Sequence, residues 1–212
     1  TIYFSVDDGD TWHPLRQNLP PSSMRDLVIH ENDLVVGTHG RSIWILDDIS
    51  PLRELAAAST AGKPYLFSPS QATRVRWNMF SDTPLPPEEP TGENPPDGAI
   101  LDYHLPQSAD TVVLEILDSR SQVVRRFSSA DPPEEVDPET LPHPTDWIRP
   151  WQGLDTSPGH HRFVWDLRHE PPRGARRQFS ISAVLEKTPS GPHGPFVPPG
   201  TYTVRLTVDG KS

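Results

Sequence analysis

The sequence predicts an all-β protein made of antiparallel sheets, and three observations support that fold class. Proline makes up 27 of the 212 residues, and a proline cannot donate the backbone hydrogen bond that a helix interior requires. Short runs in which apolar and polar residues alternate recur along the chain, as they do in strands with one buried face. Only the residues after Ser50 have the apolar spacing of a helix. The length allows one large domain or two modest ones.

Residues 1–49 are expected to form three or four strands of one antiparallel sheet. The β-branched or apolar runs are residues 2–5, 11–15, 26–30, 34–38 and 42–46. Turn-sized polar gaps separate these runs, which favours hairpin connections. A sheet of this size that is buried on both faces cannot be stable alone. That is the expected state of one β-propeller blade without its neighbours.

Residues 50–81 are predicted to be a connector with a short helix and extended segments. The Ser50 hydroxyl is a candidate N-cap, and Pro51 suits the first helical position. Gly62 and Pro64 would end the helix. Residues 82–98 follow as a proline-rich acidic linker, which makes them the best candidate for a domain boundary.

Residues 99–212 are predicted to form an immunoglobulin-like antiparallel β-sandwich. The alternating positions are residues 101–105, 112–116, 163–167 and 201–208. One face of each strand is thus expected to be buried and the other wet. Asp209-Gly210 is a strong hairpin signal, yet only two residues follow it. We therefore expect a sandwich truncated at its last strand, and the start at Thr1 without methionine likewise indicates a piece of a longer protein.

The charge distribution excludes several kinds of partner. The formal net charge is −10, and residues 82–98 and 131–146 together contain eleven acids and no Lys or Arg. The remaining chain is close to neutral, so no basic surface for nucleic acid is expected. No apolar run approaches the roughly 18 residues that a membrane-spanning helix needs. The sequence has no cysteine, which excludes disulfides, thiol catalysis and Cys-ligated zinc.

The most specific local motif is Ser5-Val6-Asp7-Asp8-Gly9-Asp10-Thr11-Trp12. In the pattern S-x-D-x-G-x-T-W, an Asp carboxylate accepts bonds from loop N–H groups and a glycine supplies a positive φ. Ser5, Asp7, Gly9, Thr11 and Trp12 are therefore predicted to build a strand-to-strand turn. The motif resembles the Asp box of bacterial neuraminidase (BNR) repeats. In sialidases and sortilins this box joins the third and fourth strands of a propeller blade on the outer rim, so the resemblance implies architecture and no chemistry.

A wider resemblance covers most of the chain outside the two acidic stretches. Residues 3–12, 25–30 and 33–49 look like the last blade of large secreted bacterial proteins known as BNR-repeat or sortilin-like glycosyl hydrolases. Similar tails in that family contain counterparts of residues 94–96, 163–168 and 199–204. The resemblance implies that residues 1–49 are the last blade and that the rest of the same propeller is a partner. It also implies an extracellular or periplasmic location.

Four residues are candidates for binding. His39 and Arg41, in the Gly-Thr-His-Gly-Arg turn, are candidates for the channel face of the propeller, with a solvated turn as the plainer alternative. Trp147 and Trp151 are candidates for stacking on a glycan, with packing over a sheet edge as the alternative. The adjacent side chains of His160-His161 would point to opposite faces of a strand, so no metal and no other cofactor is predicted.

These observations predict a non-catalytic scaffold or binding segment, in which the sandwich caps the propeller or presents a surface for a protein or glycan. No residue is assigned a catalytic role. Asp47 and Asp48 are adjacent at a strand end, which suits turn bonding or helix capping better than cleavage of a glycosidic bond. The alternative is a sialidase-like or related glycoside hydrolase whose catalytic residues lie mostly in blades outside this sequence.

Overall fold

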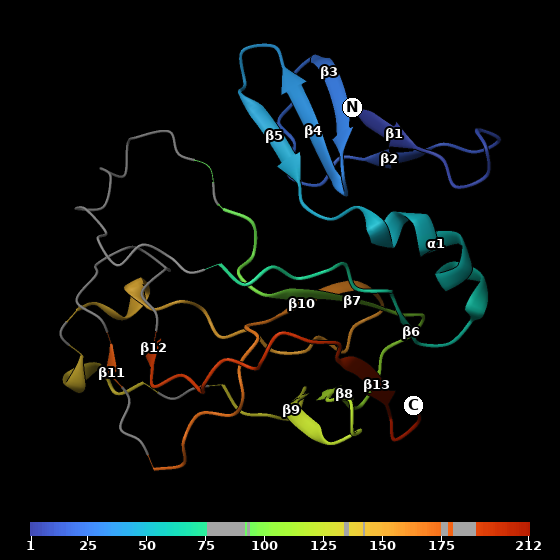
Figure 1. Ribbon diagram of the computed structural model, residues 1–212. Helices are drawn as coiled ribbons and strands as arrows, with labels where there is room; N and C mark the ends of the chain where they lie inside the picture. Colours follow the sequence, from blue (N-terminus) through green and yellow to red (C-terminus); the bar gives the residue numbers. More distant parts are fainter. Residues whose placement is uncertain (76–91, 93, 134–135, 142, 175–177, 180–189) are drawn as a thin grey trace.

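The computed structural model describes residues 1–75, 92, 94–133, 136–141, 143–174, 178–179 and 190–212. Strands dominate the regular structure and form small antiparallel sheets, which confirms the all-β prediction (Figure 1). The strands are β1 Ile2–Phe4, β2 His13–Leu15, β3 Met24–His30, β4 Asp33–Thr38, β5 Ile43–Leu46, β6 Tyr65–Leu66, β7 Ala99–Leu105, β8 Val112–Leu117, β9 Val123–Ser128, β10 Gly159–Trp165, β11 Gln178–Phe179, β12 Ser190–Gly191 and β13 Thr203–Val208. The helices in these ranges are α1 Ser50–Ala61 and the short 3-10 helices Pro138–Thr140 and Thr145–Trp147.

The first five strands form two sheets, so the prediction of a single sheet for residues 1–49 is wrong. β1 pairs with β2, and β3, β4 and β5 pair with one another in that order. The loop between the two sheets contains Pro20-Pro21, whose missing N–H groups disfavour a continuous ladder. The two sheets share one core, in which the buried side chains come from both. They are Ile2, Leu15, Leu34 and Val36, each at most 7% exposed.

The other face of the β3-β4-β5 sheet is apolar and exposed. The register places Val28, Val35 and Ile45 in one row across the three strands, and it places Ile43 two residues along β5 on the same face. The exposed fractions of Val28, Ile43 and Ile45 are 52%, 67% and 58%. Because β-branched side chains on a sheet normally pack against another layer, this face is suited to contact a further sheet.

Helix α1 is capped differently from the prediction. The N-cap position belongs to Ile49, and Ser50 is the first helical residue, so the prediction of Ser50 as the cap is wrong. The Ser50 N–H donates instead to Oδ1 of Asp48 at 3.0 Å, and a carboxylate suits the N-terminal end of a helix. The helix ends as predicted at Gly62, which takes a left-handed φ of 61°. Further along, residues 82–91 and 93 of the predicted acidic linker lie outside the described residues.

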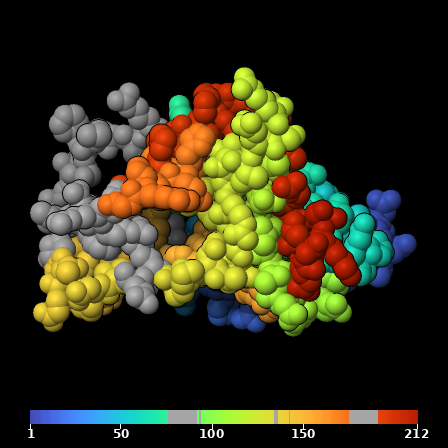
Figure 2. Space-filling view, turned by 90° about the horizontal axis from the view of Figure 1, so that it is seen from below, coloured from blue at the N-terminus to red at the C-terminus, as the bar shows by residue number. Residues whose placement is uncertain are grey.

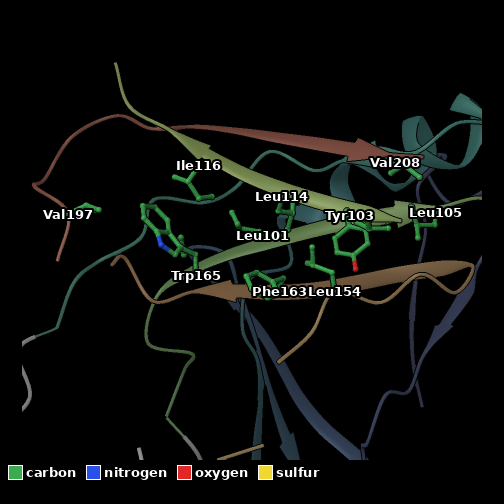
Figure 3. Packing of buried hydrophobic residues seen from close by; sticks show 12 residues of the cluster. Leu101, Tyr103, Leu105, Leu114, Ile116, Leu154, Phe163, Trp165, Val197 and Val208 are labelled. Carbon is green, nitrogen blue, oxygen red and sulfur yellow. The ribbon is translucent and has the colours of Figure 1, made fainter. Parts of the chain in front are cut away.

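Two three-stranded sheets pack together as a sandwich. One has the strand order β10-β7-β6 and the other β13-β8-β9, and all their pairs are antiparallel. Figure 3 shows the side chains that lie between the two sheets. The most deeply buried members of this core are Leu101, Tyr103, Leu105, Val112, Leu114 and Ile116, each at most 1% exposed. Full burial of one such side chain contributes roughly 1.5–3 kcal/mol. Burial of the inward-facing side chains of these alternating strands therefore stabilises the sandwich.

The turn after β13 has the hairpin geometry that the sequence predicted. Asp209 and Gly210 take φ values of 49° and 75°, as expected for a type I′ turn. Val208 and Lys211 pair across it through two backbone hydrogen bonds of 2.8 and 2.9 Å. The Asp209 carboxylate also accepts two backbone N–H groups from the loop before β8, at 2.8 and 2.9 Å. The turn therefore fixes both β13 and the start of its neighbour.

Candidate functional site

The Asp-box turn connects β1 to β2, and its polar groups bond to one another. Oδ1 of Asp7 accepts the Ser5 hydroxyl at 2.7 Å and the Thr11 N–H at 2.9 Å, and Oδ2 accepts the Thr11 hydroxyl. The bonds from Thr11, followed by the bond from Ser5, lower the pKa of Asp7 to about 2. Gly9 takes a φ of 98° and donates its N–H to the hydroxyl oxygen of Ser5 at 2.8 Å. Trp12 lies beside Gly9 and is 61% exposed. The carboxylate therefore serves the turn itself.

His39 and Arg41 lie on the exposed loop between β4 and β5. Backbone bonds fix this loop: the His39 N–H donates to the Ser23 carbonyl at 2.9 Å, and the Trp44 indole N–H donates to the Arg41 carbonyl at 2.8 Å. Gly40, between the two candidates, takes a φ of 71°, which glycine adopts readily. The turn is thus well defined while both candidate side chains face solvent.

A densely bonded polar cluster lies on the outer face of the β10-β7-β6 sheet. At its centre is Asp102 on β7, which is 3% exposed. The Arg162 guanidinium on β10 donates to this carboxylate through Nε at 3.0 Å and through Nη2 at 3.1 Å. Nε2 of His160 lies 2.9 Å from Oδ1 of Asp102. Because a buried carboxylate needs partners for its charge, the three side chains form one unit.

Arg162 also contacts the chain that follows β5. Its Nη1 and Nη2 donate to the main-chain carbonyls of Asp47 and Asp48, at 2.9 and 3.1 Å. A second polar link lies nearby, in which Asn32 donates to the Ser70 hydroxyl at 3.2 Å and that hydroxyl donates to Oδ1 of Asp48 at 3.1 Å. In Figure 1 this is the region where the end of β5 approaches the upper sheet of the sandwich. We name these contacts, together with those of Asp102 with Arg162 and His160, the junction.

Burial shifts the pKa of two groups at the junction. Burial lowers the pKa of His160 below its usual 6.5, against the opposing effect of the Asp102 carboxylate. The imidazole is therefore neutral at pH 7. Burial, followed by the nearby carboxylate of Asp33, raises the pKa of Asp47. Positive charge at the junction comes from Arg162 and from Arg53, whose Nη1 donates to Oδ1 of Asn32 at 2.7 Å.

The adjacent histidines lie on opposite faces of β10, as the sequence indicated. His160 stacks on Phe67 with 5.3 Å between the ring centroids, while His161 lies against Tyr103 at 5.1 Å. Among the described residues, no group of three His, Cys, Asp or Glu side chains is arranged to hold a metal ion.

The two candidate tryptophans lie in different surroundings. Trp147 ends a 3-10 helix and stacks on His143 with 5.6 Å between the ring centroids. Trp151 is 47% exposed and lines a groove of about 540 Å³ together with Phe127 and Phe163. Trp147 is not among the residues that line this groove. The structure therefore gives the two rings separate roles.

The Asp102–Arg162 pair was not predicted, although the alternation of the two strands carried a signal for it. Both residues occupy the polar positions of alternating strands, and the register places them directly opposite each other. Opposite charges at facing positions of an antiparallel pair attract. The two residues are sixty positions apart, so the pair becomes visible only once β7 and β10 are known to be neighbours.

Together these features define an all-β protein in which a polar junction joins a sandwich to the sheets that precede α1. No protein-family model, no curated protein and no solved structure matches this chain. Within the described ranges, no helix has the length and apolar character needed to cross a bilayer.

Proposed function

We propose that the chain is a non-catalytic scaffold segment of a secreted BNR-repeat protein, in which an immunoglobulin-like sandwich braces strands of a β-propeller. The observation that carries this proposal is the contact made by Arg162. Its guanidinium bonds to both carboxylate oxygens of the buried Asp102 and to two carbonyls at the end of β5. A planar guanidinium with four acceptors has one favoured orientation. The sandwich would therefore fix the course of the chain directly after β5.

The strands before α1 support the propeller part of the proposal. In the families that the sequence resembles, the Asp box joins the third and fourth strands of a blade. β1 and β2 would then be the outer strands of one blade, and β3, β4 and β5 would belong to the last blade, so that residues 1–49 would contribute to two blades and not to one alone. The shared core between these sheets is the contact that neighbouring blades make. The exposed face around Val28, Ile43 and Ile45 would contact a further blade, so the rest of the propeller is the proposed partner.

The carboxylates in this part of the chain support a structural role over glycoside cleavage. Asp7 is bonded within its own turn, and Oδ1 of Asp33 accepts the Asp48 N–H at 2.9 Å. Asp48 accepts the Ser50 N–H and the Ser70 hydroxyl. Glycoside cleavage needs two carboxyl groups that flank a sugar about 5–10 Å apart. Carboxylates that are engaged with backbone donors are poorly placed for that chemistry.

A hydrolysis assay tests the non-catalytic assignment. The purified chain is incubated with a panel of chromogenic aryl glycosides, including an aryl sialoside, and release of the phenol is followed by absorbance. We expect no release above the rate in buffer, because the carboxylates of Asp7, Asp33 and Asp48 are engaged in hydrogen bonds within the fold. The matched variants are Asp47→Asn and Asp48→Asn. Turnover by the wild-type chain that disappears in either variant would overturn the proposal.

A further inference from the structure

A groove on the sandwich, named here the Trp151 groove, lies among β9, β10 and the segments next to them. Its volume of about 540 Å³ is within the usual range for pockets that bind small ligands. Its lining includes Arg125, Phe127, Trp151, Gln152, Asp166 and Glu170. Figure 2 shows a hollow between the yellow-green surface of the β9 region and the orange segment that follows β10.

The Trp151 ring is a fixed platform in this groove. Almost half of the residue is exposed, at 47%. One side of the ring lies against Gly153, where an added Cβ would stand 2.2 Å from the ring atom Cζ3. Glycine at position 153 therefore leaves room for the ring to lie on the backbone. A ring fixed in this way can pack on the C–H face of a sugar with little further loss of side-chain entropy.

Charged side chains of both signs surround the platform. Arg125 and Arg126 contribute two positive charges, and Asp131, Asp166 and Glu170 contribute three negative charges. The two signs nearly balance, so the groove offers many hydrogen-bonding atoms and little net charge. This combination suits an uncharged ligand rich in hydroxyl groups better than a phosphate or a strongly charged peptide.

Arg125 supplies a positioned donor. Its guanidinium lies over the Phe127 ring, with 4.9 Å from Cζ to the ring centroid, and its Nη1 is 2.6 Å from Oε2 of Glu170. Its Nε and Nη1 are both buried, and within the described residues neither makes a hydrogen bond, although Nη1 is close to the Glu170 carboxylate. A buried donor without an acceptor is unfavourable. Because these two nitrogens are buried and the side chain is 18% exposed, a ligand oxygen would reach the guanidinium through its third nitrogen, Nη2.

We infer that the Trp151 groove binds a neutral oligosaccharide, with one sugar ring stacked on Trp151 and its hydroxyl groups bonded to Arg125 and Glu170. This inference goes beyond the proposed scaffold function, because the groove residues are not among those that make the bracing contacts. A sugar hydroxyl both donates and accepts. Two neighbouring hydroxyls can therefore accept from the guanidinium and donate to the carboxylate that lies beside it.

Titration of the full chain with neutral oligosaccharides tests this inference. The probes are the hexasaccharides of cellulose, laminarin, xylan, mannan, amylose and chitin, with tryptophan fluorescence and isothermal titration calorimetry as readouts. We expect at least one probe to bind, and Trp151→Ala to weaken its binding by about tenfold or more because the stacking surface is lost. Trp147→Ala is the matched control, since this ring stacks on His143 outside the groove, and it should bind as the wild type does.

A second variant keeps the test decisive if Trp151→Ala disturbs the loop. Glu170→Gln preserves the shape of the side chain and removes the charge beside Arg125, and we expect binding to weaken by about fivefold with an unchanged circular dichroism spectrum. The inference is overturned if no probe binds at millimolar concentration, or if Trp151→Ala and Trp147→Ala bind equally well. Such a failure would leave the bracing role intact, because that role is measured by backbone hydrogen exchange and not by ligand binding.

Discussion

Tyr103 introduces one polar atom into the sandwich core. The residue is 1% exposed, and its hydroxyl donates to the Asp155 carbonyl at 2.8 Å. We expect Tyr103→Phe to lower the free energy of unfolding by about 1 kcal/mol, because the ring stays and the carbonyl loses its donor. Urea unfolding measures the change. Tyr202→Phe is the control, since the Tyr202 hydroxyl bonds to the Pro198 carbonyl at an exposed site and its loss should cost less. Equal costs would contradict this account of the core.

Burial also raises the pKa of Tyr103 to about 12, and the sign of its pH effect follows. The folded chain favours the neutral phenol, so this contribution to stability is complete below the ordinary pKa of 10 and is lost as the pH rises toward 12. Spectrophotometric titration should show a late tyrosine ionisation near pH 12; it is measured in a Tyr65→Phe background, because the hydrogen bond to Glu54 also raises the pKa of Tyr65. That late step should be missing in Tyr103→Phe, and its persistence there would assign it to another residue.

His160 gives the junction a pH dependence of the opposite sense. Because burial lowers its pKa in the folded chain, the folded state binds a proton less readily than the unfolded state. Its contribution to stability is therefore present above about pH 6.5 and is lost as the pH falls below that value. We expect the free energy of unfolding of the wild type to fall more steeply on acidification than that of His160→Gln. Denaturant unfolding at several pH values measures this, with His30→Gln as an exposed control, and parallel profiles for wild type and His160→Gln would refute it.

The turn after β13 allows the effect of a left-handed backbone on the free energy of unfolding to be measured without any change in side-chain contacts. Gly210 takes a φ of 75°, and an added Cβ would meet no atom within 4 Å. Gly210→Ala should therefore lower the free energy of unfolding by about 1 kcal/mol through the left-handed backbone alone. Gly200→Ala, outside that backbone region and with one contact at 4.0 Å, should cost less than half as much. Thermal unfolding of both variants measures the difference, and no loss in Gly210→Ala would be inconsistent with the type I′ turn.

Elements whose contacts are local were predictable from the sequence. The Asp-box turn followed from its motif because all its bonds lie within residues 5–11, and β7 followed from alternation because its core side chains repeat every second residue. The break between β2 and β3 was not predictable in this way, since a local pattern does not say whether a strand pairs with the one that follows it. The same reason explains why the junction was missed. It also explains why Trp151 was predicted as a candidate while the groove around it was not. Both need residues that are far apart in sequence, such as Asp102 with Arg162 and Trp151 with Glu170.

Over the whole molecule, a small number of polar contacts connects the sandwich to the strands before α1. Arg162 is central, and a second arginine on the sandwich provides a comparison. Arg205 bonds to Glu115 through Nε and Nη2 at 2.8 Å each, on the β13-β8-β9 sheet. Both arginines form forked charge pairs, but only the Arg162 pair also bonds to carbonyls at the end of β5. Replacing each by lysine keeps the charge and removes the fork. The two variants differ in the contact with β5 and in the burial of the partner carboxylate, whose side chain is 3% exposed in Asp102 and 18% in Glu115.

Backbone hydrogen exchange, followed by mass spectrometry, tests the bracing role most directly. In Arg162→Lys we predict that amides of β3, β4 and β5 exchange about tenfold faster than in the wild type, because the end of β5 loses its two donors. Amides of β8 and β13 should keep their rates, and Arg205→Lys should leave β3, β4 and β5 unchanged. If Arg162→Lys speeds exchange in β7 and β10 while β3, β4 and β5 keep wild-type rates, the sandwich does not brace these strands.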